Sequence, residues 1–296
     1  MQTINFYILP ITDFSNLEKK LARISEMCAK ISVNSDIILL APSFYDSDLD
    51  GNTLFDKLKN DNSTTKFLIN FLGKINLSYK SFDDIDLSDY HNQLIDMGNT
   101  PNVNVDHVIH STDELIKYYQ KSAYCLMDFP ELFDWKRKCF PELLFSEDSF
   151  GNNNKGFGTN LPKDVFEKLY KQTVDSLLTL NNQTNELIRL DVSNRISTLQ
   201  ASLSNIECSG KGSNEDKEFK KKVYTIKEVN GEKMRVECEI ICTPHFKLIR
   251  RDSNFRIYFS WENDKIQSQK FIIVKVGSHW NDKIDSNLSE IKITYS

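Results

Sequence analysis

The residues best suited to chemistry lie close together in PHFKLIRRDSNFRIYFSW, residues 244–261. This stretch interleaves polar and basic side chains with apolar ones: His245, Lys247, Arg250, Arg251, Arg256 and Tyr258. A second such segment, VKVGSHW at 274–280, contains Lys275 and His279. Imidazole and phenol groups can exchange protons, and lysine and arginine can hold an anion such as a phosphate. The two segments together therefore predict an anion-binding site.

Strand alternation decides which of these side chains share a face, because successive strand residues point to opposite sides. His245 and Lys247 share one side of the first strand, and Arg256 and Tyr258 share one side of the second. A turn around residues 251–252 would place Lys247 opposite Arg256 and His245 opposite Tyr258. We expect one face to be apolar and packed on helices, and the other to be cationic. Because like charges across a ladder repel, we expect an anion between them, either a phosphate or a carboxylate from the acidic half of the chain.

These groups match what a metal-independent ribonuclease needs. One group takes the proton of the ribose 2′-hydroxyl, cations stabilise the charge on the phosphate, and an acid protonates the leaving oxygen. Proton exchange is assigned to His245, Tyr258 and His279. Phosphate binding is assigned to five cations: Lys247, Arg250, Arg251, Arg256 and Lys275. The alternative is structural: histidines at strand bends and solvated charges on an ordinary sheet face.

The order of the carboxy-terminal segments resembles the RelE/ParE-like toxin superfamily. The resemblance is carried by FPELLF (140–145), a helical region, and then PHFKLIRR, FRIYFSW and KFIIVKVGSHW. It is closer still to carboxy-terminal domains of prokaryotic proteins with H-x-K, RIYF or RIHF, and G-x-H strands in phage-defence and toxin-like contexts. The resemblance covers about residues 140–280. It implies a small α+β fold and, as in RelE-like members, metal-independent RNA cleavage through positions that match here: His245, Lys247, Arg256, Tyr258 and His279.

Charge is distributed unevenly along the chain. Residues 1–150 contain 14 Lys and Arg against 23 Asp and Glu, net −9, which leaves 23 against 19, net +4, for residues 151–296. An acidic half joined to a basic half indicates a polyanion-binding module next to a domain that could shield it. Because 146–160 is rich in Gly, Asn and Ser, we place a boundary near 139. Residues 1–139 are then an acidic mixed α/β domain of unknown role, and 140–296 a basic RelE-like α+β domain with helices packed on an antiparallel sheet.

Hydrophobic periodicity predicts the elements that must position these residues. In the first half we expect strands at 4–9 and 36–41 and helices at 15–31, 53–59, 63–74, 111–121 and 131–138. In the second half, 161–180 predicts an amphipathic helix, and 184–203 one or two helices with an interruption near 191–194. A period of two then predicts an antiparallel meander with an Asn-Gly turn at 230–231 and strands at 223–228, 233–249, 255–261 and 270–276.

Other features narrow the class of protein. The first residues carry no basic segment followed by an apolar run, and no apolar run is long enough to span a bilayer, so we expect a cytoplasmic protein. The six cysteines lack zinc-like spacing and are expected to be reduced. A calcium-like loop at 46–57 ends in Lys57 where a glutamate is needed, and His107 and His110 lie in an extended segment. We therefore predict neither a metal nor a cofactor.

Two functions stay open from the sequence, besides the possibility that the chain is one subunit of a larger complex whose chemistry lies elsewhere. The first is a toxin-like or phage-defence protein that binds RNA and cleaves it without metal, with the amino-terminal domain as regulator. The second is a non-catalytic subunit of a prokaryotic defence complex that binds nucleic acid or protein. Degradation of RNA in EDTA would separate the two, since a binding module should show salt-dependent binding and leave the RNA intact.

Overall fold

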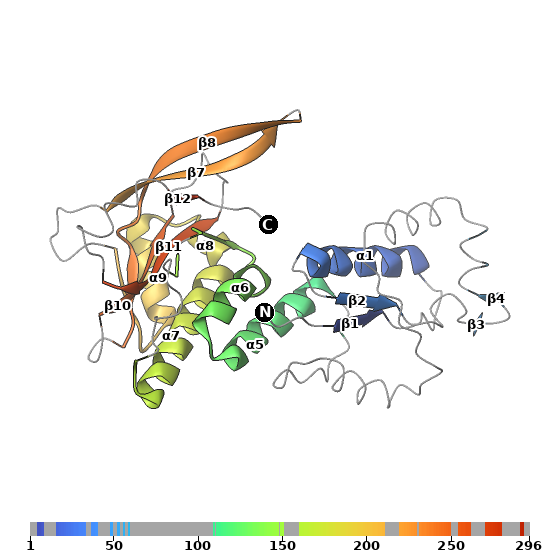
Figure 1. Ribbon diagram of the computed structural model, residues 1–296, viewed down its shortest axis with the longest axis horizontal. Coiled ribbons are helices and arrows are strands. Elements are labelled where there is room, and N and C mark those ends of the chain that lie inside the picture. Colours follow the sequence, from blue (N-terminus) through green and yellow to red (C-terminus); the bar gives the residue numbers. More distant parts are fainter. Residues whose placement is uncertain are drawn as a thin grey trace. The chain divides into compact units, whose positions relative to one another are not determined.

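The computed structural model belongs to the mixed α+β class and divides into two compact units, Met1–Cys125 and Leu126–Ser296 (Figure 1). The structure describes residues 5–8, 16–33, 37–40, 48–49, 52–53, 56, 59, 109, 111–147, 149–150, 160–210, 219–229, 231–249, 254–261, 270–279 and 291–292. Six helices lie within these residues. No helix in the described part of the chain combines the length and the hydropathy needed to cross a membrane.

The first unit opens with a strand, a helix and a parallel strand. Strand β1 (Asn5–Ile8) pairs with β2 (Ile37–Leu40), and α1 (Leu17–Val33) connects them. The helix predicted at 15–31 is confirmed, and Leu21, Cys28 and Ile31 on it are buried. A short hairpin of β3 (Asp48–Leu49) and β4 (Asn52–Thr53) follows. The helices predicted at 53–59 and 63–74 fall largely outside the described residues, as do His107 and His110.

Side-chain caps fix the starts of the next two helices. Helix α5 (Thr112–Leu126) is capped by Ser111, whose Oγ accepts a hydrogen bond from the Glu114 backbone N–H at 3.2 Å. Helix α6 (Phe129–Cys139) begins after Asp128, whose carboxylate accepts a hydrogen bond from the backbone N–H of Glu131 at 2.8 Å. Each cap gives a helix N–H a partner that the helix itself cannot supply.

Three further helices of the second unit agree with the predicted periodicity: α7 (Lys163–Asn182), α8 (Thr184–Leu187) and α9 (Val192–Ser202). The interruption predicted near 191–194 lies slightly earlier, at 188–191 between α8 and α9. Arg195 stabilises it, because its Nε donates to the carbonyls of Leu187 and Leu190, both at 2.8 Å. Leu187 is the last residue of α8 and Leu190 lies in the interruption, so a side chain of α9 holds both in place.

A five-stranded sheet forms the centre of the second unit, in the order β5-β11-β10-β9-β6. Its strands are β5 (Leu143–Phe145), β6 (Glu207–Ser209), β9 (His245–Lys247), β10 (Phe255–Ser260) and β11 (Phe271–Ser278). The expected antiparallel sheet needs correction, because β5 runs parallel to β11 and the sheet is mixed. Helices α7, α8 and α9 lie between β5 and β11 in the chain. A long connection of this kind allows two strands to pair in parallel.

The apolar face of this sheet packs on helices, as predicted. Phe246, Ile257 and Phe259 are fully buried on it, and the rings of Phe246 and Phe259 stack at 5.1 Å. The Arg195 guanidinium of α9 lies over the Trp261 ring, 5.5 Å from its centroid. In Figure 1, α7 and α9 lie alongside β10 and β11. Burial of these rings is the main apolar contribution of the sheet to the core.

A second sheet follows the order β12-β7-β8, with strands β7 (Lys220–Val229), β8 (Glu232–Ile241) and β12 (Ile291–Lys292). The predicted two-residue turn is confirmed, because Val229 pairs with Glu232 and Gly231 has a φ of 82°. The single strand expected at 233–249 is wrong: β8 ends at Ile241, and β9 belongs to the other sheet. Pro244 has no N–H for a ladder, which favours a break at this position.

Candidate functional site

The predicted register of the central hairpin is confirmed residue by residue. Arg256 of β10 pairs with Lys247 of β9, and Tyr258 pairs with His245. On its other side, β10 pairs with β11, so that Lys275 lies opposite Tyr258. Directly opposed residues share a face, and the alternation of β11 continues that face toward His279. We call the group Lys247, Arg256, Lys275 and His279 the cationic corner.

The three rings proposed for proton exchange, those of His245, Tyr258 and His279, lie side by side on this face. The ring of Tyr258 is 5.1 Å from that of His245 and 6.5 Å from that of His279, measured between centroids. The planes of Tyr258 and His279 are nearly perpendicular, at 84°. Phe219 approaches Tyr258 from another side, at 6.1 Å and 85°. Tyr258 is therefore at the centre of an aromatic group that joins the sheet to the segment before β7.

The expected exposure of this face is wrong for two of the three rings. Tyr258 is 1% exposed and His245 is 5% exposed. Tyr258 belongs to a hydrophobic cluster that includes Val223 of β7 and Ile240 of β8. At Tyr258 the predicted cationic face is therefore covered by the β7–β8 hairpin, which alternation within β10 alone could not reveal. Only His279 of the three is exposed to solvent.

A bulge in β11 marks the border between the polar and apolar parts of this face. The register between β10 and β11 shifts between Tyr258 and Phe259, where Val274 is the additional residue. Val274 is buried in the cluster around Tyr258, and Lys275, its neighbour in the chain, is only half-buried. At a bulge, two residues of one strand oppose one residue of the other, so a charged and an apolar residue lie side by side here.

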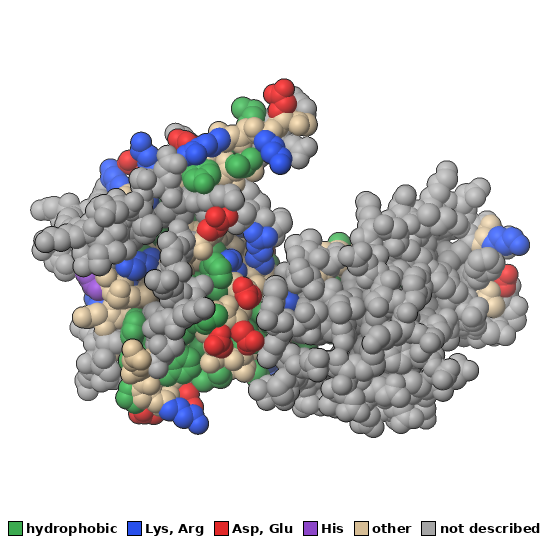
Figure 2. All heavy atoms as spheres, in the orientation of Figure 1, with side chains coloured by type: hydrophobic (Ala, Val, Ile, Leu, Met, Phe, Trp, Pro, Cys, Tyr) green, Lys and Arg blue, Asp and Glu red, His purple; other side chains and the backbone are tan. Residues whose placement is uncertain are grey.

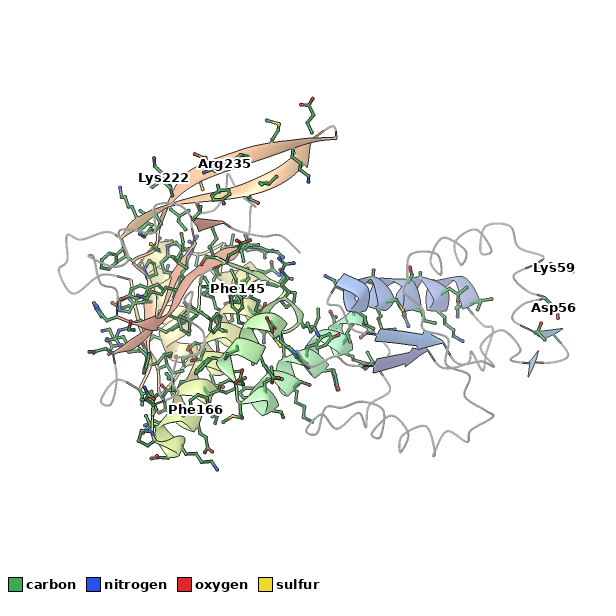
Figure 3. All side chains as sticks on the ribbon, in the orientation of Figure 1. Asp56, Lys59, Phe145, Phe166, Lys222 and Arg235 are labelled. Atoms are coloured by element: carbon green, nitrogen blue, oxygen red, sulfur yellow. The ribbon has the colours of Figure 1, made fainter. Side chains whose placement is uncertain are left out.

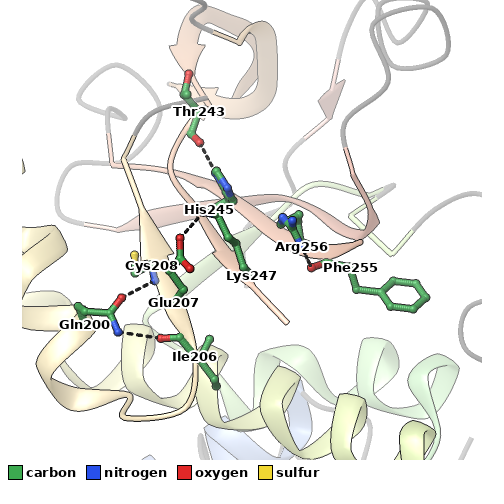
Figure 4. Close-up of polar contacts among 9 residues, drawn as sticks. All are labelled: Gln200, Ile206, Glu207, Cys208, Thr243, His245, Lys247, Phe255 and Arg256. Atoms are coloured by element: carbon green, nitrogen blue, oxygen red, sulfur yellow. Dashed lines mark hydrogen bonds and ion pairs between the residues drawn. The ribbon is translucent and has the colours of Figure 1, made fainter. Parts of the chain in front are cut away.

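His245 is neutral in the folded protein at pH 7. Burial is the main cause that lowers the pKa of His245 to about 4, and the charges of Arg256 and Lys247 lower it further. Its Nδ1 lies 2.9 Å from the carbonyl oxygen of Thr243, so in the neutral ring Nδ1 carries the proton and donates it (Figure 4). Nε2 then carries the lone pair and can only accept. A base of such low pKa is a weak partner for proton transfer near pH 7.

The anion expected beside Lys247 is a carboxylate of the chain itself. Glu207 of β6 pairs with Lys247 in the ladder, and its carboxylate accepts a hydrogen bond from Lys247 Nζ (Figure 4). The two side chains are 28% and 25% exposed, respectively, so their attraction is only partly screened. Of the two anions that the sequence left open at this point, the structure contains the carboxylate. It comes from β6 of the second unit and not from the acidic half.

The remaining cations have different surroundings. Arg256 is half-buried, and its NH1 donates to the Phe255 carbonyl at 2.8 Å. Lys275 is half-buried and His279 exposed. The strand ladders bring Arg256 and Lys275 onto neighbouring strands of one face. Arg250 and Arg251 lie outside the described residues, so their predicted role in phosphate binding stays a prediction.

Glu207 is the one functional neighbour that sequence reasoning missed. It is separated from Lys247 by 40 residues. The segment around it, Glu207–Ser209, is only three residues long, too short for a period of two to be recognised. The sequence signal that could have indicated this strand is an acidic residue directly before an apolar one, Cys208. Cys208 is buried in the structure. A charged residue beside a buried thiol indicates an edge strand with one side in solvent.

The described residues offer neither a metal-binding cluster nor a reactive thiolate at Cys208. Within the described ranges, no group of three or more His, Cys, Asp or Glu side chains could hold a metal ion. The six cysteines are free thiols, as predicted: Cys28, Cys125, Cys139, Cys208, Cys238 and Cys242. Burial raises the pKa of Cys208 to about 12, which makes its thiolate, the reactive form, inaccessible at neutral pH.

No protein-family model matches the chain, and neither a curated protein nor a solved structure is significantly similar to it. The resemblance to the RelE/ParE-like toxin superfamily therefore rests on the sequence motifs alone.

Proposed function

We propose that the second unit binds RNA through phosphate contacts at the cationic corner. The observation that supports this most is the shared face of three neighbouring strands, which brings Lys247, Arg256 and Lys275 together beside the exposed His279. Flexible Lys and Arg side chains on such a face suit the phosphates of a single strand. A net charge of +4 over residues 151–296 also favours a negatively charged ligand.

Binding is favoured over cleavage by the state of the buried rings. His245, with a pKa of about 4, is a weak general base, and Tyr258 is 1% exposed. A general base must come within hydrogen-bond reach of the hydroxyl that it deprotonates, and a buried phenol cannot do so without opening the β7–β8 cover. The residues with solvent access are the cations and His279, which are suited to holding a phosphate.

The ion pair between Glu207 and Lys247 fits a binding surface that is weakened by its own carboxylate. A phosphate that approaches Lys247 must compete with Glu207, so the corner would bind with moderate affinity and strong salt dependence. Removal of the Glu207 charge should therefore strengthen binding. The proposal can therefore be tested by a substitution that should raise the affinity for RNA, whereas most substitutions in a binding site lower it.

The experiment is a titration of the full chain with a fluorescently labelled single-stranded RNA, followed by anisotropy at several salt concentrations. Each phosphate contact contributes about 0.7 to the slope of log K against log salt for single strands. Arg256→Ala and Lys275→Ala should each weaken binding and reduce the slope by about that amount. Lys163→Ala is the matched control, because Lys163 forms an ion pair with Glu167 on α7, away from the sheet. Equal effects of all three substitutions would contradict the proposal.

Metal-independent cleavage of RNA is the second candidate function. It is supported by the position of Tyr258, whose ring centroid lies 5.1 Å from that of His245 and 6.5 Å from that of His279. The same RNA incubated with the full chain in EDTA should then be shortened, and His279→Ala and Tyr258→Phe should abolish the shortening. Binding with intact RNA would leave the first proposal standing and remove the second.

A further inference from the structure

The β7–β8 hairpin has an open edge. In the order β12-β7-β8, strand β8 has a hydrogen-bonded neighbour on one side only among the described strands. Figure 1 shows the turn end of the hairpin projecting from the second unit. Strand β8 spans ten residues, Glu232–Ile241, and Met234 near its start is 51% exposed. A long, open edge is a template for pairing with another strand.

The hairpin geometry determines which β8 residues point their backbone groups toward this edge. Val229 and Glu232 flank a two-residue turn, and such a pair exchanges both of its backbone hydrogen bonds. Bonded and non-bonded pairs then alternate along the ladder. The even-numbered residues of β8 therefore bond to β7. The odd-numbered residues point their N–H and C=O groups to the open side: Lys233, Arg235, Glu237 and Glu239.

All four outward-bonding residues are charged, and the one other charged residue of β8 is Glu232 at the turn. Arg235 and Glu237 lie on the outer face of the hairpin, where Arg235 Nε donates to the Glu237 carboxylate. The Arg235 guanidinium also lies 4.0 Å from the centroid of the Tyr224 ring. Figure 2 shows basic and acidic side chains interspersed along this hairpin, and Figure 3 labels Lys222 and Arg235 on it. Along the edge, two basic residues, Lys233 and Arg235, are therefore followed by two acidic ones, Glu237 and Glu239.

We infer that β8 pairs antiparallel with β8 of a second copy of this chain, about a two-fold axis at Val236. In this register Lys233 lies opposite Glu239 and Arg235 opposite Glu237, each pair occurring twice because of the symmetry. The four pairs are all of opposite charge and all at outward-bonding positions, so each can exchange backbone hydrogen bonds as well. The two sheets would join into one continuous sheet.

The neighbouring registers are disfavoured by the same charges. A shift of the axis to Arg235 places the two Arg235 side chains opposite each other, and a shift to Glu237 does the same for the two Glu237 side chains. Like charges directly opposite destabilise a ladder. Among these registers, the one centred on Val236 places opposite charges across from each other at every outward-bonding pair. Because the edge is complementary to itself in this register, we take a second copy of the chain as its occupant.

The inner face of the paired strands is apolar in this register. Val236 lies opposite Val236 of the second copy, and Met234 lies opposite Cys238. These are positions without mutual backbone bonds, where the two Cα atoms approach to about 4.5 Å. Met234 would lose part of its 51% exposure in the pair. The inference concerns assembly and stands independently of RNA binding.

Analytical ultracentrifugation of the full chain at micromolar concentrations tests the pairing. We expect a reversible dimer. Arg235→Glu should raise its dissociation constant about tenfold or more, because it creates like-charge pairs, and the added Glu237→Arg should restore the dimer. Glu237→Pro removes an outward N–H while the bonds to β7 stay, and should give monomers. A chain that is monomeric throughout, or a dimer that Glu237→Pro leaves intact, overturns the inference.

Disulfide formation tests the register itself. Met234→Cys should give a covalent dimer under mild oxidation, through a bond to Cys238 of the second copy, and Cys238→Ser should prevent it. Positions 234 and 238 of one strand are roughly 13 Å apart by strand rise, so the bond cannot form within a chain. Far-ultraviolet circular dichroism shows whether each variant keeps its fold. A folded Met234→Cys dimer that persists with Cys238→Ser would contradict the proposed register.

Discussion

The pH dependence of stability can be traced to His245. The folded-state pKa of His245 is lowered from 6.5 to about 4, mainly because the ring is buried. Below pH 6.5 the unfolded chain takes up a proton that the folded protein refuses until about pH 4. His245 therefore favours unfolding as the pH falls through this window, and its contribution is complete below about pH 4.

The size of the effect follows from the two pKa values. A difference of roughly 2.5 between them corresponds to about 3 kcal/mol of unfolding free energy, of which about 2 kcal/mol is already lost by pH 5. The substitution His245→Asn keeps a side-chain N–H near the Thr243 carbonyl but cannot be protonated in this range. The variant should be less stable than the native protein at pH 7, because ring contacts with Tyr258 are lost. The difference should shrink by about 3 kcal/mol between pH 7 and pH 4.

Urea denaturation followed by tryptophan fluorescence gives the required free energies. All three tryptophans of the chain, Trp135, Trp261 and Trp280, lie in the second unit, so the signal reports that unit. Tyr258→Phe is the matched control, since it changes a ring contact of His245 but leaves the histidine in place. If native protein and His245→Asn lose stability in parallel as the pH falls, the burial argument for His245 is refuted.

Three further predictions concern single contacts. Glu207→Gln should tighten RNA binding about threefold to tenfold, because Lys247 no longer has a charged partner; weaker binding in anisotropy would contradict this. Asp128→Ala should cost about 1 kcal/mol of unfolding free energy through loss of the α6 cap, with Asp128→Asn near neutral by urea denaturation. Gln172→Leu should lower the unfolding free energy by about 1–3 kcal/mol. The buried Ile249 N–H donates to Gln172 Oε1 at 2.7 Å and would lose its hydrogen-bond partner. A Gln172→Leu variant as stable as the native protein would contradict that account.

Within the described residues, local patterns predicted the helices and the central hairpin well. The pairing of Arg256 with Lys247 and of Tyr258 with His245 could be predicted because a short connection and strict alternation leave few registers. Helices α7 and α9 followed from their apolar periodicity. The α+β class followed from the succession of these elements.

Contacts between distant segments could not be predicted in this way. The sequence of β10 contains no sign that Val223 and Ile240 cover Tyr258, because that cover depends on how two sheets pack. The pairing of Glu207 with Lys247 depends on a three-residue strand that periodicity cannot detect. Both contacts change the chemistry of the site: one buries its proposed acid or base, and the other supplies its anion.

The bulge at Val274 limits how the length of β11 can change during evolution. Deletion of Val274 would convert the shifted pairing into a regular ladder, and Phe271 and Lys275 would both keep the side of the sheet on which they now lie. Loss of a residue with the bulge retained would instead turn one end of the strand over. Shortened homologues that retain this sheet should therefore lack the residue that aligns with Val274, and lengthened ones should carry their additional residues in the loops.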